Sequence, residues 1–398
     1  MKNLLNDCSL SAVVAGMIAT FISYAGPLVI IFHAAQNASL SPEILSSWVW
    51  AISIGSGVLG AVLSLRWRVP VVIAWSIPGS ALLVTALPHT GLNQAIGAYL
   101  VANLILLLIG LSGAFDRIIA RLPGSIAAGM QAGILFSFGI EVFRALPVQP
   151  MLVLSMFITY IVMRRAWPRY AVAAVLLVGG AITLLGGHLR SEALVFALAT
   201  PQWITPEFNL AAILNLSLPL VLVALTGQFM PGMAVLRNAG FNTPASPIIS
   251  ASALGGMLLA PFGCHGLNLA AVTASLCAGK EAHENPKRRY IAALSGSATY
   301  LVFGIAGATL VSLFAAFPAA LIAALAGLAL YGAISDALVR SLAEPKERDA
   351  GLFTFLVTAS GVSFLGMSAA FWGLMFGVLT HFLIVARRPA PAACSSQN

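Results

Sequence analysis

Hydrophobic residues dominate the chain in long blocks, and charged residues are confined to the short stretches between those blocks. Runs without any Asp, Glu, Lys or Arg extend over residues 8–42, 69–115, 238–279, 290–335 and 350–386. Because a helix needs about 20 residues to cross the hydrocarbon core of a bilayer, several of these runs are long enough for two crossings. The pattern predicts an all-α polytopic membrane protein.

Fourteen transmembrane segments fit these blocks: 9–33, 46–65, 70–87, 93–113, 123–141, 149–163, 170–187, 211–231, 246–260, 261–278, 290–314, 317–335, 350–364 and 366–385. With this count, 18 of the 20 Lys and Arg residues lie in loops on the side of the N-terminus, and only Arg144 and Arg190 lie on the other side. Short loops rich in Lys and Arg stay in the cytoplasm. Both termini are therefore expected in the cytoplasm.

Composition supports this class, because 60% of residues are hydrophobic, 8% are charged and the mean hydropathy is +0.96. The net charge of +8 is explained by loop orientation, and no basic face indicates a nucleic-acid partner. Asp7 interrupts the first block, which is also too long for a signal peptide, so the first span is expected to be retained.

The four cysteines, Cys8, Cys264, Cys277 and Cys394, show no metal-ligand spacing and are interpreted as free thiols. Neither a metal nor a cofactor is expected. The polar, Pro- and Ala-rich residues 388–398 are expected to be a disordered tail.

Two segments, 70–87 and 261–278, each combine a few extended residues with a half-length helix inside an uncharged run. A pair of broken segments in corresponding halves of a chain is typical of transporters with an inverted repeat, here seven spans plus seven. Extended backbone at membrane depth is tolerated only where protein or a water-filled cavity surrounds it. We therefore expect the segments to cross at the midplane, with one helix capped by Ser76 and the other starting after Gly266.

All twelve acidic residues fall in predicted loops or at the ends of spans, which disfavours a cation as substrate. The N-terminus of a helix carries about half a positive charge and free N–H groups, so two such ends favour an anion. Neutral donors and aromatic surface near the crossing suit a carboxylate on an aromatic ring. The candidate substrate-binding residues are Tyr24, Trp75, Ser76, Gly79, Ser80, Gln228, Phe229, Phe262, Gly263, His265, Gly266 and Asn268.

His265 is the only one of six histidines expected at the midplane, where it could bind the substrate, carry the proton or simply be a buried packing residue. Gln228 and Asn268 could instead hold helices together. The aromatic candidates taken singly resemble packing residues. Near the outer surface, Glu141 and Arg144 are expected to form a solvated pair.

Glycines in the spans could form sliding contacts between moving parts, or they could simply allow close helix packing. These residues are Gly55, Gly57, Gly60, Gly129, Gly133, Gly139 and Gly327.

Three stretches, AWSIPGSALLVTAL (74–87), PFGCHGLNLAAVTASLCAGKEAH (261–283) and FLVTASGVSFLGMSAAFWGL (355–374), resemble the BenE family of benzoate:proton symporters. The resemblance extends over about residues 9–385. It implies proton-driven import of benzoate or a similar aromatic carboxylate, and a fold shared with nucleobase and sulfate carriers. It also implies that a core domain (1–122 and 201–316) moves against a gate domain (123–200 and 317–387) like an elevator.

The chain departs from nucleobase carriers of that fold at Gln228 and Asn268, where those carriers have acidic residues. This difference argues against a nucleobase and leaves two proton carriers open, His265 or the carboxylate of the substrate. Besides substrate and protons, the expected partners are membrane lipids, and a homodimer is left open.

Two other classes of function remain. A passive channel or an exchanger for small anions would use the same helix ends. An intramembrane enzyme is disfavoured, because the sequence contains neither a His-Glu-x-x-His nor a Gly-x-Ser-x-Gly motif and no pair of aspartates at mid-membrane.

Overall fold

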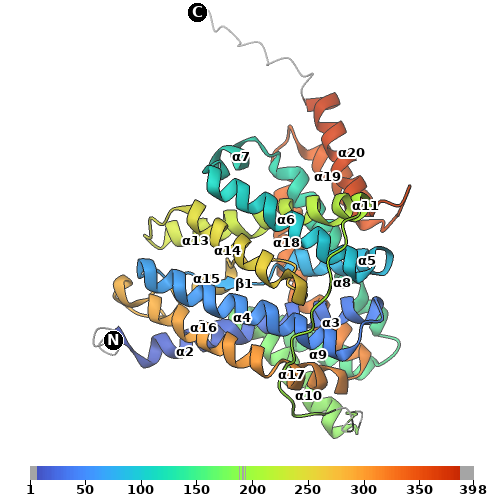
Figure 1. The fold of residues 1–398 in the computed structure, drawn as a ribbon. Coiled ribbons are helices and arrows are strands. Elements are labelled where there is room, and N and C mark those ends of the chain that lie inside the picture. The colour runs from blue at the N-terminus through green and yellow to red at the C-terminus, as the bar shows by residue number, and fades with distance from the viewer. Residues whose placement is uncertain (1–6, 188, 191, 193, 386–398) are drawn as a thin grey trace, which may run out of the picture.

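The computed structural model describes residues 7–187, 189–190, 192 and 194–385 (Figure 1). The predicted tail at 388–398 lies outside this described part. The chain is predominantly helical, as predicted, and the fourteen predicted spans each coincide with a helix or with a broken segment. The helices of the first half are α2 (Leu10–Ala25), α3 (Pro27–Asn37), α4 (Pro42–Trp67), α5 (Ile77–Thr90), α6 (Leu92–Ser112), α7 (Phe115–Arg121), α8 (Gly124–Ala145), α9 (Pro150–Ala166) and α10 (Ala171–Leu185).

The second half repeats the alternation of long, broken and short helices. Its main helices are α14 (Ala245–Leu259), α15 (Val272–Ala278), α16 (Tyr290–Ile305), α17 (Gly307–Ala316), α18 (Ala319–Leu342), α19 (Arg348–Ala359) and α20 (Ala369–Thr380). Within the described residues, seven helices are long and apolar enough to cross a membrane alone, or eight if α16 and α17, which bend by 72°, form one span. The count of fourteen depends on shorter and broken segments and stays a prediction.

One helix of the second half, Leu210–Asn238, is continuous but has an irregular pitch. It consists of α11 (Leu210–Ala212), α12 (Leu218–Ala224) and α13 (Met230–Asn238), joined by the π-helical stretches η3 (Ile213–Ser217) and η4 (Leu225–Phe229). Pro219 and Pro231 each follow a π-helical stretch by two residues. Because proline has no N–H and crowds the carbonyl four residues earlier, the turn before it widens.

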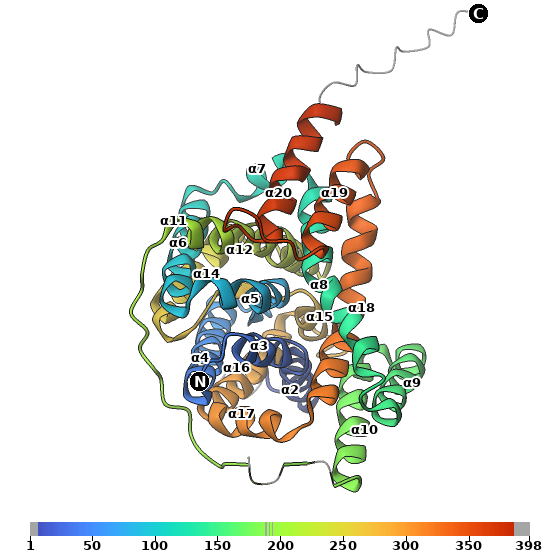
Figure 2. The same cartoon turned by 90° about the vertical axis from the view of Figure 1, so that its right-hand side faces the viewer.

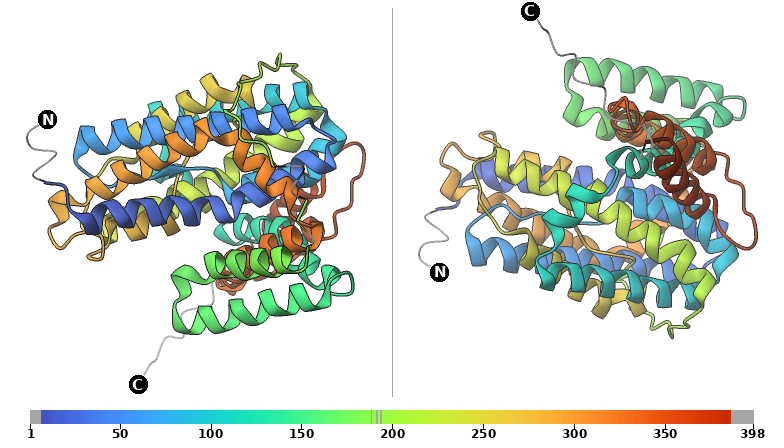
Figure 3. Two further views of the ribbon diagram at one scale, coloured as in Figure 1. Left: turned by 90° about the horizontal axis from the view of Figure 1, so that it is seen from below. Right: turned by 90° about the horizontal axis from the view of Figure 1, so that it is seen from above.

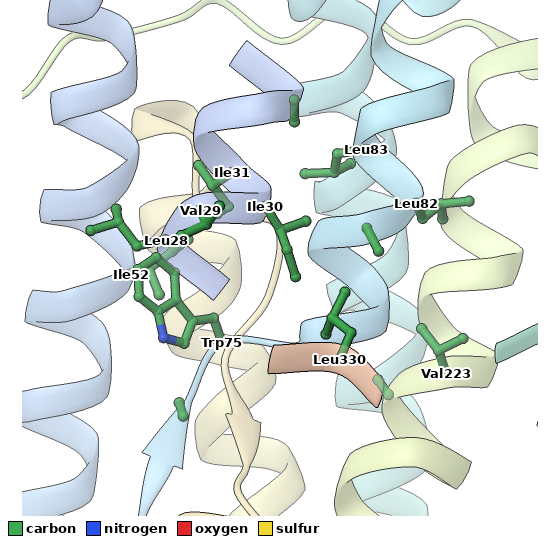
Figure 4. Packing of buried hydrophobic residues seen from close by; sticks show 14 of the residues in the cluster. Leu28, Val29, Ile30, Ile31, Ile52, Trp75, Leu82, Leu83, Val223 and Leu330 are labelled. Atoms are coloured by element: carbon green, nitrogen blue, oxygen red, sulfur yellow. The ribbon is translucent and has the colours of Figure 1, made fainter. Parts of the chain in front are cut away.

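The two broken segments cross as predicted. Strand β1 (Ile73–Ala74) pairs antiparallel with β2 (Asn268–Leu269), so that Ile73 lies opposite Leu269. The Ala270 N–H extends this pairing with a hydrogen bond of 2.9 Å to the Val72 carbonyl. Figure 4 shows the two strands side by side, with buried residues of α3 and α5 packed beyond them. The backbone groups of these extended residues thus satisfy one another inside the protein.

The helices gather into two groups (Figures 2 and 3). Helix α8 packs along α18 and α19, α19 packs on α20, and α9 packs on α10 and α18. The other group contains α2 to α6 and α12 to α17. Buried apolar side chains run between the groups without interruption, since Leu330 of α18 and Val223 of α12 belong to one cluster (Figure 4). The division into gate and core domains and their relative motion stay predictions.

The connection between the halves follows the outer side of the second group as an extended chain (Figure 2). Backbone hydrogen bonds attach Ala199 to Ile305, Ile204 to Pro261 and Glu207 to Asn93. This strap, residues 194–209, therefore packs against α16, the second broken segment and α6.

The glycines considered as sliding contacts pack within a group instead. A Cβ on Gly129 would lie 2.3 Å from the Gly351 carbonyl of α19, and one on Gly327 would lie 2.4 Å from the Phe138 carbonyl of α8. In the other group, Gly57 faces Leu301 and Ser297 of α16. The packing interpretation of these glycines therefore holds, and they form no sliding surface between the groups.

Candidate functional site

The first functional element is the N-terminal end of α5, directly after the crossing. The Ser76 side chain accepts a hydrogen bond of 3.0 Å from the Gly79 N–H, and its carbonyl accepts one of 2.7 Å from the Ser80 N–H. Pro78 has no N–H to satisfy, which suits the first turn of a helix. The prediction that Ser76 caps this helix is confirmed.

Gly79 lies on the inner side of this turn. A Cβ there would lie 2.9 Å from Ser76 Oγ and 3.2 Å from Leu220 Cδ2. A side chain at this position would therefore displace either the cap or the neighbouring helix α12.

The second broken segment is shaped differently from its counterpart. It begins with a 3₁₀ turn, η5 (Ala260–Phe262), and bends at Gly263, whose φ is +101°. A Cβ on Gly263 would lie 1.2 Å from Trp48 Cδ1, so this glycine has a packing role. The expected helix start after Gly266 is wrong, because strand pairing keeps the chain extended and α15 begins only at Val272.

The two helix ends consequently do not meet at one point. Helix α5 follows β1 and helix α15 follows β2, and these strands run in opposite directions. The helices therefore start at opposite ends of the strand pair. Only the end of α5 is capped by a side chain.

His265 connects the two broken segments. Its Nε2 lies 3.1 Å from Ser80 Oγ, across from the first turn of α5. The side chain is buried, its ring lies 6.2 Å from that of Tyr99, and its Nδ1 has no hydrogen-bond partner among the described residues. A buried imidazole with one nitrogen unpartnered suits a binding or proton-carrying role.

A small cavity lies beside this histidine, with room for about one water molecule. Four predicted site residues line it, together with residues of α6 and α12. The lining residues are Ser76, Ala102, Asn103, Leu106, Leu220, Ala224, His265, Gly266 and Asn268.

Two of the aromatic candidates lie elsewhere. The Tyr24 and Trp75 rings pack edge to face at 4.9 Å, and the Tyr24 hydroxyl is hydrogen-bonded to Ser53. The Trp75 indole N–H donates to the Ser23 carbonyl at 3.1 Å. In Figure 4 the Trp75 side chain lies among Leu28, Val29 and Ile52. Both aromatic side chains thus have packing partners of their own and are not among the cavity-lining residues.

Phe262 and Phe229 are likewise separate from the cavity lining. The Phe262 ring packs against Trp50 at 5.7 Å and Trp203 at 5.5 Å, where the strap passes. Phe229 is fully buried in η4. The packing interpretation accounts for the contacts of both.

Gln228 lies where the two helix groups meet. The neighbouring Gly227 faces Gln131 of α8, because a Cβ there would lie 3.0 Å from Gln131 Oε1 and 3.7 Å from Pro78. Gln131 Oε1 accepts a hydrogen bond of 3.2 Å from Arg340 of α18. We call the contact of Pro78, Gly227 and Gln131 the seam.

Several other predictions are settled by the described residues. Glu141 and Arg144 form an exposed ion pair of 2.8 Å, as expected. Cys8, Cys264 and Cys277 are free thiols, and Cys394 lies outside the described part.

Sequence reasoning missed two site residues of α6. Asn103 lines the cavity, and the Tyr99 ring faces His265. The available signal was the amide of Asn103 in the middle of an otherwise apolar span, which is costly in a membrane unless it has a partner or a function.

Comparison with known families identifies the family of this chain. A family model described as benzoate membrane transport protein matches residues 6–383, nearly the whole chain. The chain belongs to the BenE family. It is thus an integral, multi-pass membrane transport protein and not an enzyme, as predicted.

Curated relatives agree with BenE membership. The chain is 48% identical over 385 residues to the benzoate membrane transport protein of Acinetobacter baylyi, covering 97% of this chain and 98% of the relative. It is 39% identical over 370 residues to the inner membrane protein YdcO of Escherichia coli, covering 93% and 95%.

Solved structures show the BenE fold to be shared with anion carriers. SLC26A9 superposes with a TM-score of 0.64 at 12% identity, over 96% of this chain and 66% of the SLC26A9 chain. The transmembrane domain of the cyanobacterial bicarbonate transporter BicA superposes with a TM-score of 0.58 at 12% identity, covering 93% and 98%. At this identity the likeness concerns the fold alone.

Proposed function

We propose that the protein imports benzoate or a similar aromatic carboxylate together with protons across the bacterial inner membrane. Support for the substrate comes from the name of the Acinetobacter relative, and support for the membrane from that of the Escherichia relative. The single observation that carries the chemistry is the contact of 3.1 Å between His265 Nε2 and Ser80 Oγ at the capped end of α5. It places a protonatable group beside a positive helix end.

The carboxylate binds next to this helix end. The α5 dipole and the Ser80 hydroxyl favour a negative charge there, and no aspartate or glutamate lines the adjacent cavity. His265 gains a counter-charge when it is protonated, so the anion and the proton stabilise each other. One proton per carboxylate makes the transport cycle electroneutral.

The aromatic ring needs more room than the cavity offers, since the cavity holds about one water molecule. The ring therefore enters along the seam, between Pro78, Gly227 and Gln131. The absence of a side chain at Gly227 and the apolar ring of Pro78 suit such an entry.

Transport follows an elevator-like cycle, in which the group with the crossed segments carries the substrate past α8 and α18. In this cycle Gly227 has no side chain that would interlock with Gln131 as the groups move. Both termini face the cytoplasm, as the distribution of Lys and Arg indicates.

Uptake of radiolabelled benzoate into proteoliposomes tests this function. With an inward proton gradient, benzoate should accumulate above its equilibrium concentration, salicylate should compete, and sulfate and uracil should not. A channel would only equilibrate benzoate, and an exchanger would need an anion inside the vesicle. Either result contradicts proton symport.

The elevator is tested by joining the two groups at the seam. Gln131→Cys and Gly227→Cys, in a chain whose natural cysteines are replaced by serine, should react with a short bifunctional thiol reagent. The cross-link should stop uptake, and uptake should return when a cleavable reagent is used and then reduced. Full uptake by the cross-linked protein would exclude motion at the seam.

A further inference from the structure

Asn103 of α6 has a role that the carboxylate site does not explain. Its side chain is 1% exposed, and its Nδ2 donates a hydrogen bond of 2.8 Å to the Tyr99 carbonyl. This bond fixes the orientation of the amide, because the reverse orientation would bring two oxygens together. The Oδ1 atom is left buried without a hydrogen-bond partner.

Two further unpartnered polar atoms belong to the same cavity. Asn268 Oδ1 and His265 Nδ1 are both buried, and both residues line the cavity with Asn103. Two elements, α6 and the second broken segment, thus contribute three residues with unsatisfied polar atoms to one cavity. Buried polar groups are nearly always hydrogen-bonded, so such a set indicates a ligand.

The chemistry of these atoms selects the ligand. Two amide oxygens can only accept hydrogen bonds, and a carboxylate can only accept them as well, so the substrate anion has no favourable contact with them. A water molecule donates two hydrogen bonds and accepts others, and the cavity has room for about one. The ligand is therefore water and not the substrate.

We propose that Asn103, Asn268 and His265 form a water-binding proton site, separate from the carboxylate site at the end of α5. The water donates its two O–H groups to Asn103 Oδ1 and Asn268 Oδ1 and directs a lone pair away from them. The proposed site uses the neutral tautomer in which Nε2–H donates to Ser80 Oγ, 3.1 Å away, and Nδ1 is left as an acceptor. This inference rests on the proposed proton symport.

Protons and charges balance when one proton is transferred at this site. The water takes one proton from the aqueous side and gives one proton to His265 Nδ1, so that it is neutral again and the imidazole carries one positive charge. The Tyr99 ring lies 6.2 Å from the imidazole, Cys264 precedes His265 in the chain, and among the described residues no acidic or basic side chain other than the histidine lines the cavity. The substrate carboxylate at the end of α5 is therefore the counter-ion, which couples one proton to one anion.

Gly256 of α14 makes room for this arrangement. A Cβ there would lie 2.3 Å from Asn103 Oδ1 and 2.8 Å from its Cγ. The amide can occupy its position only because residue 256 has no side chain.

Asn103→Leu tests the proposal in proteoliposomes, with Asn93→Leu as the control at the other end of α6. Benzoate counterflow at equal pH should persist in both variants, because it needs binding but no net proton transfer. Accumulation driven by a proton gradient should fall about tenfold or more in Asn103→Leu only, together with the ratio of protons to benzoate. Wild-type coupling in Asn103→Leu would overturn the proton site.

Asn103→Ser keeps the proposal testable if the leucine variant does not fold. Its hydroxyl retains an acceptor, so it should keep more of the coupling than Asn103→Ala, measured as protons taken up per benzoate. Equal coupling in these two variants would contradict the proposal. Failure of the proposed symport itself would appear separately, as wild-type protein that does not couple benzoate to protons.

Discussion

The two broken segments occupy corresponding places in the two halves of the chain but contribute different things to the site. The first, residues 70–90, has a side-chain cap and a helix of 14 residues. The second, residues 261–278, has two glycines with positive φ and an uncapped helix of seven residues. In the proposed site the first supplies a helix end and the second supplies the side chains of His265 and Asn268. Corresponding segments of the two halves thus share the strand pairing but differ in helix length, capping and polar side chains.

The largest expected effect comes from removing the reactive side chain of the second segment. His265→Ala should lower proton-driven benzoate accumulation by about a hundredfold or more, because the proton carrier is lost. His89→Ala, at the exposed end of α5, is the control. Retained proton-coupled uptake in His265→Ala, measured with a pH dye inside the vesicles, would remove this histidine from the mechanism.

Filling the space inside the first turn of α5 should have the next largest effect. Gly79→Leu places a side chain against Ser76 and Leu220, so benzoate affinity should fall about tenfold or more. Gly124→Leu, where a Cβ meets open space, should bind as the wild type does. Binding of radiolabelled benzoate to purified protein measures both, and equal affinities would mean that the end of α5 does not contact the substrate.

Replacing Ser76 tests whether the cap of α5 contributes to benzoate binding as well as to stability. Ser76→Ala should cost about 1 kcal/mol of stability and weaken benzoate binding about fivefold. Ser9→Ala, which removes the cap of α2, should destabilise similarly and leave binding unchanged. Thermal unfolding and binding isotherms test this pair. Loss of stability without loss of affinity in Ser76→Ala would place the carboxylate elsewhere.

The smallest effect is expected at the outer end of the second segment. Phe262→Leu removes ring contacts with Trp50 and Trp203 but no cavity-lining group, so uptake should change by less than about twofold. Initial rates of uptake measure this. A large loss of benzoate affinity in this variant would indicate that Phe262 contacts the substrate.

The sequence predicted the broken segments, the cap and the position of His265 because local signals encode them. Proline, glycine and a capping serine act on the backbone within a few residues, and the absence of charge marks the membrane spans. The family motifs, too, are contiguous stretches that need no knowledge of packing.

The contents of the cavity could not be predicted in the same way. Asn103 and Asn268 line the same cavity because of tertiary packing, which includes that of α6 against α14. The Tyr24 hydroxyl is hydrogen-bonded to Ser53, which lies on another helix. The late start of α15 depends on pairing with β1, almost 200 residues earlier in the chain. Such partners are fixed by tertiary contacts, which no local pattern records.

The bend at Gly263 has a practical consequence for genetics. Because the indole of Trp48 fills the space where any side chain at 263 would stand, a substitution there will impair assembly in the membrane and expose the chain to quality-control proteolysis. Loss of transport in a variant with a substitution at residue 263 therefore indicates failed assembly and not altered substrate binding. Screens for altered substrate preference gain resolution when that codon is held constant and the neighbouring ones are randomised.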